Sequence, residues 1–225
     1  SSVETGTYAI SGTTGSGLTL EGGTGITDGA CNYQILTGIK VFDPKTSELT
    51  LLTSTNSHIP TNSPLICVYR DRLVLASDFI WYMSRQGDPT DWDYGADDTD
   101  LQRAVAGNTA DAGQIGQPLT ALIPHSDDYL IMGCENQIWI LRGDPAYGGQ
   151  IDNLSYEVGI LNSSSWCRLP DTSIMFLSRH GVYVLPPGAS GYPQDFSKDL
   201  LPQELINVDS TSFISMQYDL DNDRV

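Results

Sequence analysis

The sequence predicts an all-β fold made of repeated antiparallel units joined by long loops. The chain has 22 Gly and 12 Pro among 225 residues, and long stretches with the 3.6-residue period of amphipathic helices are largely absent. Short apolar runs bounded by turn residues recur in pairs instead, which is typical of β-hairpins. A hydrophobic content of 40% is sufficient for the core of one large domain.

Three hairpins share one pattern, in which two apolar runs flank a tight polar turn. Aligning the second runs places Trp81, Trp139 and Tyr183 at the same position, with spacings of 58 and 44 residues. The paired runs are 73–76 with 79–83, 129–133 with 137–141, and 174–177 with 182–185. Because a period of ~40–50 residues is that of a propeller blade, we expect a β-propeller-like series of antiparallel blades.

The remaining elements are expected around these hairpins. Residues 1–33 are rich in Gly, Thr and Ser and predict an arm or edge hairpin, whereas residues 34–225 form the propeller-like body. The turn 43–47, with Pro at its first central position, predicts a further hairpin. Strands are also expected at 35–42, 49–53, 65–69, 120–124, 155–160 and 165–169, a helical turn at 101–105 and a short helix at 196–206.

The C-terminal residues predict the start of one more unit. Residues 212–218 have the pattern of a strand, and residues 219–223 that of a turn, after which a return strand is due. The first residue is Ser1 rather than Met. We therefore expect the chain to be a fragment of a larger protein, with a body that is incomplete at its C-terminus.

The charge and the cysteines exclude several classes of function. A formal charge of −17, from 28 acidic and 11 basic residues, disfavours a grip on nucleic acid or on an anionic membrane, although an acidic wall would let DNA pass. Cys31, Cys67, Cys134 and Cys167 form no C-x-x-C pair, so a metal knuckle is not expected. Free buried thiols are favoured, and the sequence still allows one disulfide bond. No apolar run approaches the ~20 residues of a membrane span.

No motif points to catalysis or to a cofactor. The acidic stretch from Asp91 to Asp100 invites a calcium site, but its order differs from an EF-hand and a solvated loop is favoured. The three histidines form no spaced cluster, and Ser178 near His180 lacks a positioned acid. We expect no enzyme activity, no metal and no cofactor. Trp92, which lies on the acidic stretch between two Asp residues, is expected to contact a partner.

Three sequence motifs together resemble one family. They are YRDRLVLA at 69–76, SRQGDPTDWD at 84–93 and FLSRHGVY at 176–183, with a strand running into Gly-Asp-Pro between the last two. In this order they resemble the propeller-bearing tail nozzle, or tail hub, proteins of short-tailed bacteriophages. The resemblance covers about half the chain, residues 69–185. It implies a structural virion protein that forms a six-fold tail ring around the channel through which DNA leaves.

The resemblance also implies partners. They are further copies of the chain in a hexameric ring, tail proteins such as the adaptor and fibres, and viral DNA that passes without sequence-specific binding; no membrane is involved. The residues expected to contact partners or the channel are Asp88, Asp91, Trp92, Asp93, Tyr94, Asp97 and Asp98. The alternative is a propeller that binds or processes carbohydrate, since such proteins use carboxylates on loops.

Overall fold

The chain divides into two units, Ser1–Thr37 and Gly38–Val225. The computed structural model describes residues 10–14, 17–20, 38–107, 115–189, 191–197, 214–222 and 224–225. In the first unit, β1 (Ile10–Thr14) pairs with β2 (Gly17–Leu20) in an antiparallel hairpin. The predicted boundary, between residues 33 and 34, lies four residues before the observed one.

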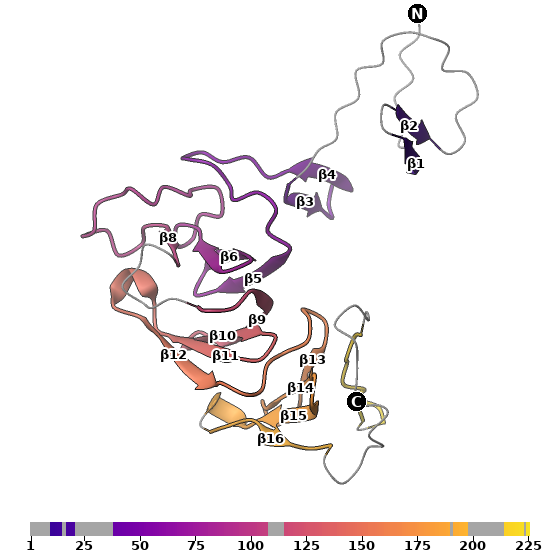
Figure 1. Ribbon diagram of the computed structural model, residues 1–225. Coiled ribbons are helices and arrows are strands. Elements are labelled where there is room, and N and C mark those ends of the chain that lie inside the picture. Colours follow the sequence, from indigo (N-terminus) through magenta and orange to yellow (C-terminus); the bar gives the residue numbers. More distant parts are fainter. Residues whose placement is uncertain are drawn as a thin grey trace, which may run out of the picture. The chain divides into compact units, whose positions relative to one another are not determined.

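The second unit contains three four-stranded antiparallel sheets, in each of which every strand lies beside the next one along the chain (Figure 1). The first sheet comprises β5 (Leu65–Tyr69), β6 (Arg72–Ser77), β7 (Ile80–Met83) and β8 (Val105–Ala106). The second comprises β9 (Leu119–Ser126), β10 (Tyr129–Cys134), β11 (Ile138–Arg142) and β12 (Gln150–Ser155). The third comprises β13 (Trp166–Arg168), β14 (Ile174–Ser178), β15 (Gly181–Leu185) and β16 (Gln194–Asp195). The all-β prediction and the three central hairpins are confirmed.

A separate hairpin precedes the first sheet. It consists of β3 (Lys40–Asp43) and β4 (Glu48–Leu51), joined by the predicted Pro-containing turn. The Asp43 carboxylate closes this turn by accepting a hydrogen bond from the Lys45 amide at 2.8 Å. Every side chain of the two strands is exposed except that of Leu51, which is half-buried.

Two apolar clusters hold the three sheets together. Between the first and second sheets, Val74, Trp81 and Met83 belong to the same cluster as Leu130 and Met132. The second cluster lies between the second and third sheets, and the residues that the second sheet gives it alternate along β10 and β11 with those of the first cluster. It includes Ile131, Ile140, Ile174, Phe176 and Leu185. Because successive strand residues point to opposite faces, β10 and β11 are apolar on both faces, and the second sheet lies between the other two.

The predicted alignment of the three aromatic residues is wrong by one position. Trp139 and Tyr183 each stand two residues after the pair that closes their hairpin, whereas Trp81 stands one residue after it. The residue equivalent to Trp139 is therefore Tyr82. A one-residue step moves a side chain to the other face, so Trp81 faces the following sheet while Trp139 and Tyr183 face the preceding one.

Several minor elements differ from expectation. The outer strand of the second sheet is β12, which ends at Ser155 where residues 155–160 were predicted, because a tight turn through Gly148 brings the chain back earlier. Residues 101–105 form a turn that leads into β8 rather than a helical turn. The described residues contain only two 3-10 turns, η1 (Pro145–Tyr147) and η2 (Pro187–Ala189), and no α-helix. Most of the helix predicted at 196–206 lies outside the described residues.

The C-terminal prediction is correct for the turn and not for the strand. Residues 214–218 form no assigned strand, and a bridge between Asp219 and Arg224 closes a turn after them. None of the described segments forms a helix that is long and apolar enough to cross a membrane.

Candidate interaction surface

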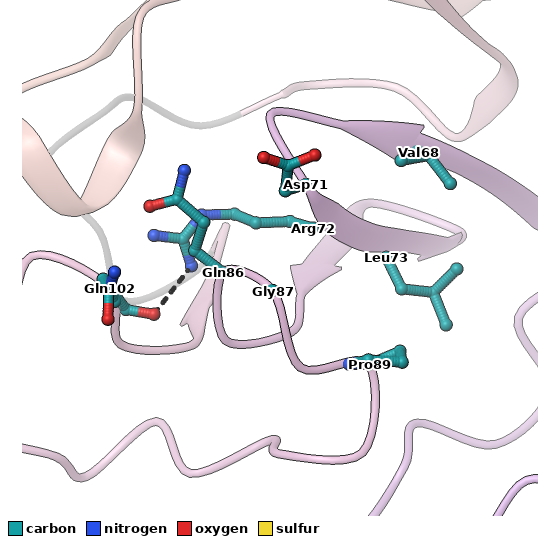
Figure 2. A pocket seen from close by; sticks show the side chains of 8 residues that line it. All are labelled: Val68, Asp71, Arg72, Leu73, Gln86, Gly87, Pro89 and Gln102. Atoms are coloured by element: carbon teal, nitrogen blue, oxygen red, sulfur yellow. Dashed lines mark hydrogen bonds between the residues drawn. The ribbon is translucent and has the colours of Figure 1, made fainter.

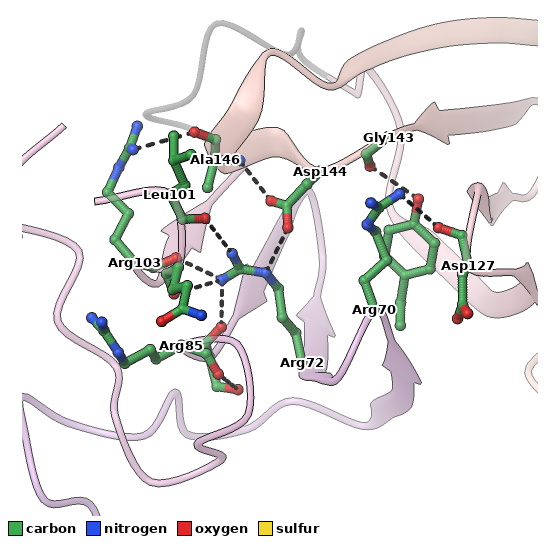
Figure 3. A network of polar contacts seen from close by, with 12 residues as sticks. Arg70, Arg72, Arg85, Leu101, Arg103, Asp127, Gly143, Asp144 and Ala146 are labelled. Carbon is green, nitrogen blue, oxygen red and sulfur yellow. Dashed lines mark hydrogen bonds and ion pairs between the residues drawn. The ribbon is translucent and has the colours of Figure 1, made fainter. Parts of the chain in front are cut away.

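A buried arginine joins the first sheet to the second (Figure 3). Arg72, at the start of β6, is only 1% exposed, and its Nε lies 3.1 Å from the Asp144 carboxylate beyond β11. Burial lowers the pKa of the Arg72 guanidinium, and Asp144 opposes this effect. Its remaining nitrogens donate to backbone carbonyls of Ser84, Leu101, Gln102 and Arg103, at 2.6–3.2 Å. A single side chain therefore fixes the second sheet and the loop after β7.

Polar contacts beside Arg72 reinforce the same joint. The Tyr69 hydroxyl donates to the Gly143 carbonyl at 2.9 Å, and the Arg70 guanidinium to the Asp127 carbonyl at 2.8 Å (Figure 3). Arg103, in the loop after β7, reaches the Ala146 carbonyl at 3.3 Å. The motif at 69–76 thus supplies ties between two sheets: Tyr69 and Arg70 donate to backbone carbonyls, and Arg72 donates to the Asp144 carboxylate.

The repeated Gly-Asp-Pro sequence forms the same turn twice. Gly87 and Gly143 both adopt φ +75°, and their amides donate to the carbonyls of Asp71 and Asp128, at 2.8 and 2.9 Å. In each copy the Asp carboxylate accepts from the amide two residues later, Thr90 or Ala146. The first and second sheets therefore share one exit turn.

A cavity of about 600 Å³ opens beside Arg72 (Figure 2). Its lining consists of Val68, Asp71, Arg72, Leu73, Gln86, Gly87, Pro89 and Gln102. The only arginine among them already meets one carboxylate and four carbonyls, one of which is that of Gln102. The cavity is therefore a poor site for an anion, because the Arg72 guanidinium is already paired with acceptors of the protein itself.

The acidic loop, residues 84–104, is ordered by its own carboxylates. Five Asp side chains each accept a hydrogen bond from the backbone amide two residues further on; they are Asp88, Asp91, Asp93, Asp97 and Asp100. Such turns satisfy loop amides without a regular sheet. Arg85 pairs with Asp100 at 2.6 Å and closes the loop across fifteen residues.

Trp92 anchors this loop from inside. Its side chain is 0% exposed, and its indole nitrogen donates to the Pro89 carbonyl at 2.9 Å. The backbone amide of Trp92 donates to Asn56, and that of Thr55 to Thr90, so the linker before β5 packs along the loop. The Trp92 indole is therefore enclosed by its own chain, where the sequence predicted a contact with a partner.

The other predicted contact residues fall into three groups by burial. Asp93, Asp97 and Asp98 are exposed, and the Asp98 side chain reaches 96% exposure although it pairs with Arg103. Asp88 and Tyr94 are half-buried, and Asp91 is buried. The structure thus brings the seven residues together on one loop and presents three carboxylates at its surface.

Three carboxylates of the loop, those of Asp88, Asp97 and Asp100, have depressed pKa values with local causes. The Thr90 hydroxyl lowers the pKa of Asp88, and the amides of Thr99 and Gln102 lower those of Asp97 and Asp100. In the part of the chain that the structure describes, no three side chains of the His, Cys, Asp or Glu type gather closely enough to hold a metal ion. The carboxylates therefore serve the loop backbone rather than a common centre.

The sequence reasoning overlooked Arg72 and Asp144 as a pair. They lie 72 residues apart, and neither stands out in composition. The sequence feature that could have indicated this pair is the Gly-Asp-Pro repeat, because the Asp of its second copy, Asp144, faces Arg72 of the 69–76 motif. No protein-family model matches the chain, and no curated protein is significantly similar to it.

Proposed function

We propose that this chain is a non-enzymatic structural protein of a bacteriophage tail, and that copies of it form a ring around the channel through which DNA leaves. Within each copy the four-stranded sheets are arranged about an axis as the blades of a propeller. Two features support the radial arrangement: the sheets follow one another with shared cores, and β5 and β9, the first strands of adjacent sheets, approach each other closely.

The observation that carries the proposal is what the motif residues do. Tyr69, Arg70 and Arg72 come from the first motif, and each ties its sheet to the second. Gly87 and Asp88 come from the second motif and form its turn, and the third motif forms the hairpin of β14 and β15. Residues that carry the family resemblance thus hold the architecture, as a mechanical role in a ring requires.

The acidic loop supplies the surface for neighbours and for the channel. It is held firmly by Trp92 and by the pair of Arg85 with Asp100, while Asp93, Asp97 and Asp98 project to solvent. A rigid loop loses little conformational entropy when a neighbour binds. With a net charge of −17, the protein repels a phosphate backbone, so a channel wall of this composition lets DNA slide.

Electron microscopy of the purified protein, alone and with adaptor-type tail components, tests the proposal. We expect rings of six copies; monomers under every condition contradict it. In assembled particles, replacing Asp93, Asp97 and Asp98 with Lys is expected to slow DNA ejection, because lysines at the wall hold phosphates. The matched control replaces Asp78, Asp127 and Asp152, which are exposed and lie outside the loop, with Lys. A glycan array that gives reproducible binding favours the carbohydrate alternative instead.

A further inference from the structure

A β-bulge in β9 places a histidine at the joint between the second and third sheets. β9 pairs with β10 through Ser126 and then through Pro124, so His125 is the extra residue between them. The corresponding pairing of β5 with β6 in the first sheet is regular. A bulge changes the direction in which a side chain points, and the His125 ring lies against the Tyr129 ring, with 4.7 Å between the two centroids.

The surroundings of His125 carry positive charge from the third sheet. Tyr129 packs against the apolar cluster between the second and third sheets, and Arg168 of β13 donates to the Pro124 carbonyl, next to His125. Arg142 of β11 lies 6.0 Å from the Tyr129 ring centroid and pairs with a carboxylate, that of Asp152. Arg168 forms no ion pair among the described residues.

The His125 ring is neutral in this setting. Both of its ring nitrogens are enclosed, and neither bonds a partner in the part of the chain that the structure describes. Burial lowers the pKa of the imidazole, and the charge of Arg168 lowers it further. The backbone at Thr172 and at His125 itself opposes this effect without completing a hydrogen bond. A proton on the ring would therefore place an unpaired N–H and a buried charge beside an arginine.

The carboxylates nearest in the chain do not offset this charge. Asp127 and Asp128 lie in the turn between β9 and β10, and Asp171 lies in the turn between β13 and β14. The Asp171 carboxylate accepts from the amide and the hydroxyl of Ser173. None of the three is a cause of the shift in the pKa of His125, whereas Arg168 is.

The joint between the first and second sheets has a different chemistry. It depends on Arg72 with the Asp144 carboxylate, and on donation from Tyr69 and Arg70 to backbone carbonyls. None of these four described residues is a histidine, the side chain whose ordinary pKa of about 6.5 lies between pH 5 and pH 8. The two joints therefore differ in how they respond to mild acid.

We propose that the joint between the second and third sheets is a pH-sensitive switch, which is closed while His125 is neutral and opens when the ring takes up a proton from solvent. In the open form water solvates the charged ring, and the ring moves away from Arg168. The first and second sheets stay joined through Arg72 and Asp144, so acid releases the third sheet alone. This inference does not depend on a role in a virion.

The direction of the effect follows from proton linkage. Because the folded joint lowers the pKa of His125, the open form binds more protons than the closed form. The stability that the neutral ring provides is complete above the ordinary pKa of about 6.5, and it is lost as the pH falls toward the pKa of the closed form. Between these two values the opening equilibrium should rise by up to about tenfold for each pH unit, as uptake of one proton requires.

A titration of the histidine rings by NMR tests the first step on the whole chain. The His125 signal is identified by its loss in the His125→Gln variant. We expect its midpoint below the ordinary value of about 6.5. A midpoint at or above that value overturns the inference, and this measurement is made on the unmodified protein.

Hydrogen exchange at about pH 7.5 and about pH 5.5, corrected for the pH dependence of chemical exchange, tests the opening. In the wild type and in the control His180→Gln, whose histidine is exposed, opening of β14 relative to β6 is expected to increase in acid. In His125→Gln this ratio should stay constant. An increase that persists in His125→Gln, or equal opening of β6 and β14, overturns the inference.

Arg168→Gln provides a second variant that keeps the histidine. Removing the neighbouring charge should raise the midpoint of the His125 titration and reduce the increase in β14 opening between the two pH values. A midpoint and an increase equal to those of the wild type would show that Arg168 does not act on the ring, and would overturn the mechanism.

Discussion

Replacing Asp144 with Asn should destabilise the protein strongly. The change keeps an acceptor for the Ala146 amide, which Asp144 binds at 2.9 Å, and removes the one carboxylate that faces Arg72. The two side chains are 0% and 10% exposed, so the guanidinium would remain charged in a site with little water. Breaking a buried pair by removing one partner costs about 3–5 kcal/mol.

The expected value lies at the lower end of this range, at about 3 kcal/mol, because Arg72 retains four carbonyl acceptors. With an m value of about 2 kcal/mol per molar urea, the unfolding midpoint falls by about 1.5 M. The control is Asp98→Asn, which breaks an exposed pair with Arg103 and should cost less than about 1 kcal/mol.

A double-mutant cycle separates the pair from its surroundings. Arg72→Met combined with Asp144→Asn should cost less than the sum of the single changes, by about 1–3 kcal/mol, because the double variant leaves no unpaired charge. If Asp144→Asn moves the urea midpoint no further than Asp98→Asn does, the joint between the first and second sheets does not depend on this contact.

Four further predictions follow from the packing and hydrogen bonds of the described residues. Trp92→Ala should cost about 3–5 kcal/mol in urea unfolding, against about 0.5 kcal/mol or less for the exposed Tyr147→Ala; equal costs would mean that the loop does not bury its indole. Gly133→Ala should destabilise by about 1–3 kcal/mol, since a Cβ there lies 2.8 Å from Ile160, whereas Gly116→Ala meets open space; the difference in melting temperature tests this. Asp88 has a pKa below its ordinary value, so its contribution to folding stability is present above the unfolded pKa of about 4 and is lost as the pH falls through the folded pKa. The difference in unfolding free energy between wild type and Asp88→Asn should therefore shrink below about pH 4. A difference that stays constant with pH would refute this stabilising role. Burial raises the pKa of the Cys67 and Cys134 thiols to about 12, so alkylation at pH 8, followed by mass spectrometry, should be slow until the protein unfolds; labelling as fast as in urea would contradict the packing.

The hairpins could be predicted because their signal is local. Paired apolar runs and a tight turn lie within about twenty residues, and these features predicted β6 with β7, β10 with β11 and β14 with β15. The first two hairpins also carry a Gly-Asp-Pro exit. The face to which each aromatic side chain points could not be predicted in the same way. It depends on the distance from the closing pair of the turn, and Trp81 lies one residue nearer to that pair than Trp139 does.

The candidate surface was predicted only in part, for a physical reason. A run of Asp residues indicates a solvated loop, and Asp93, Asp97 and Asp98 are indeed exposed. The charged neighbours of Trp92 led to the prediction that it lies at the surface. Burying the large apolar indole stabilises the fold by more than the partial burial of its charged neighbours costs, and the loop therefore closes over it. The pair of Arg72 with Asp144 depends on how two sheets meet, which no local pattern encodes.

The central claim is that successive four-stranded sheets are arranged about one axis. A high-resolution cryo-electron microscopy map of the assembled protein tests it most directly. We expect β5, β9 and β13 to lie nearest the axis, the sheets to fan outward from them, and Arg72 to contact Asp144 between the first and second sheets. A map in which the strands form one continuous two-layer sandwich, with no common axis, would contradict the radial arrangement.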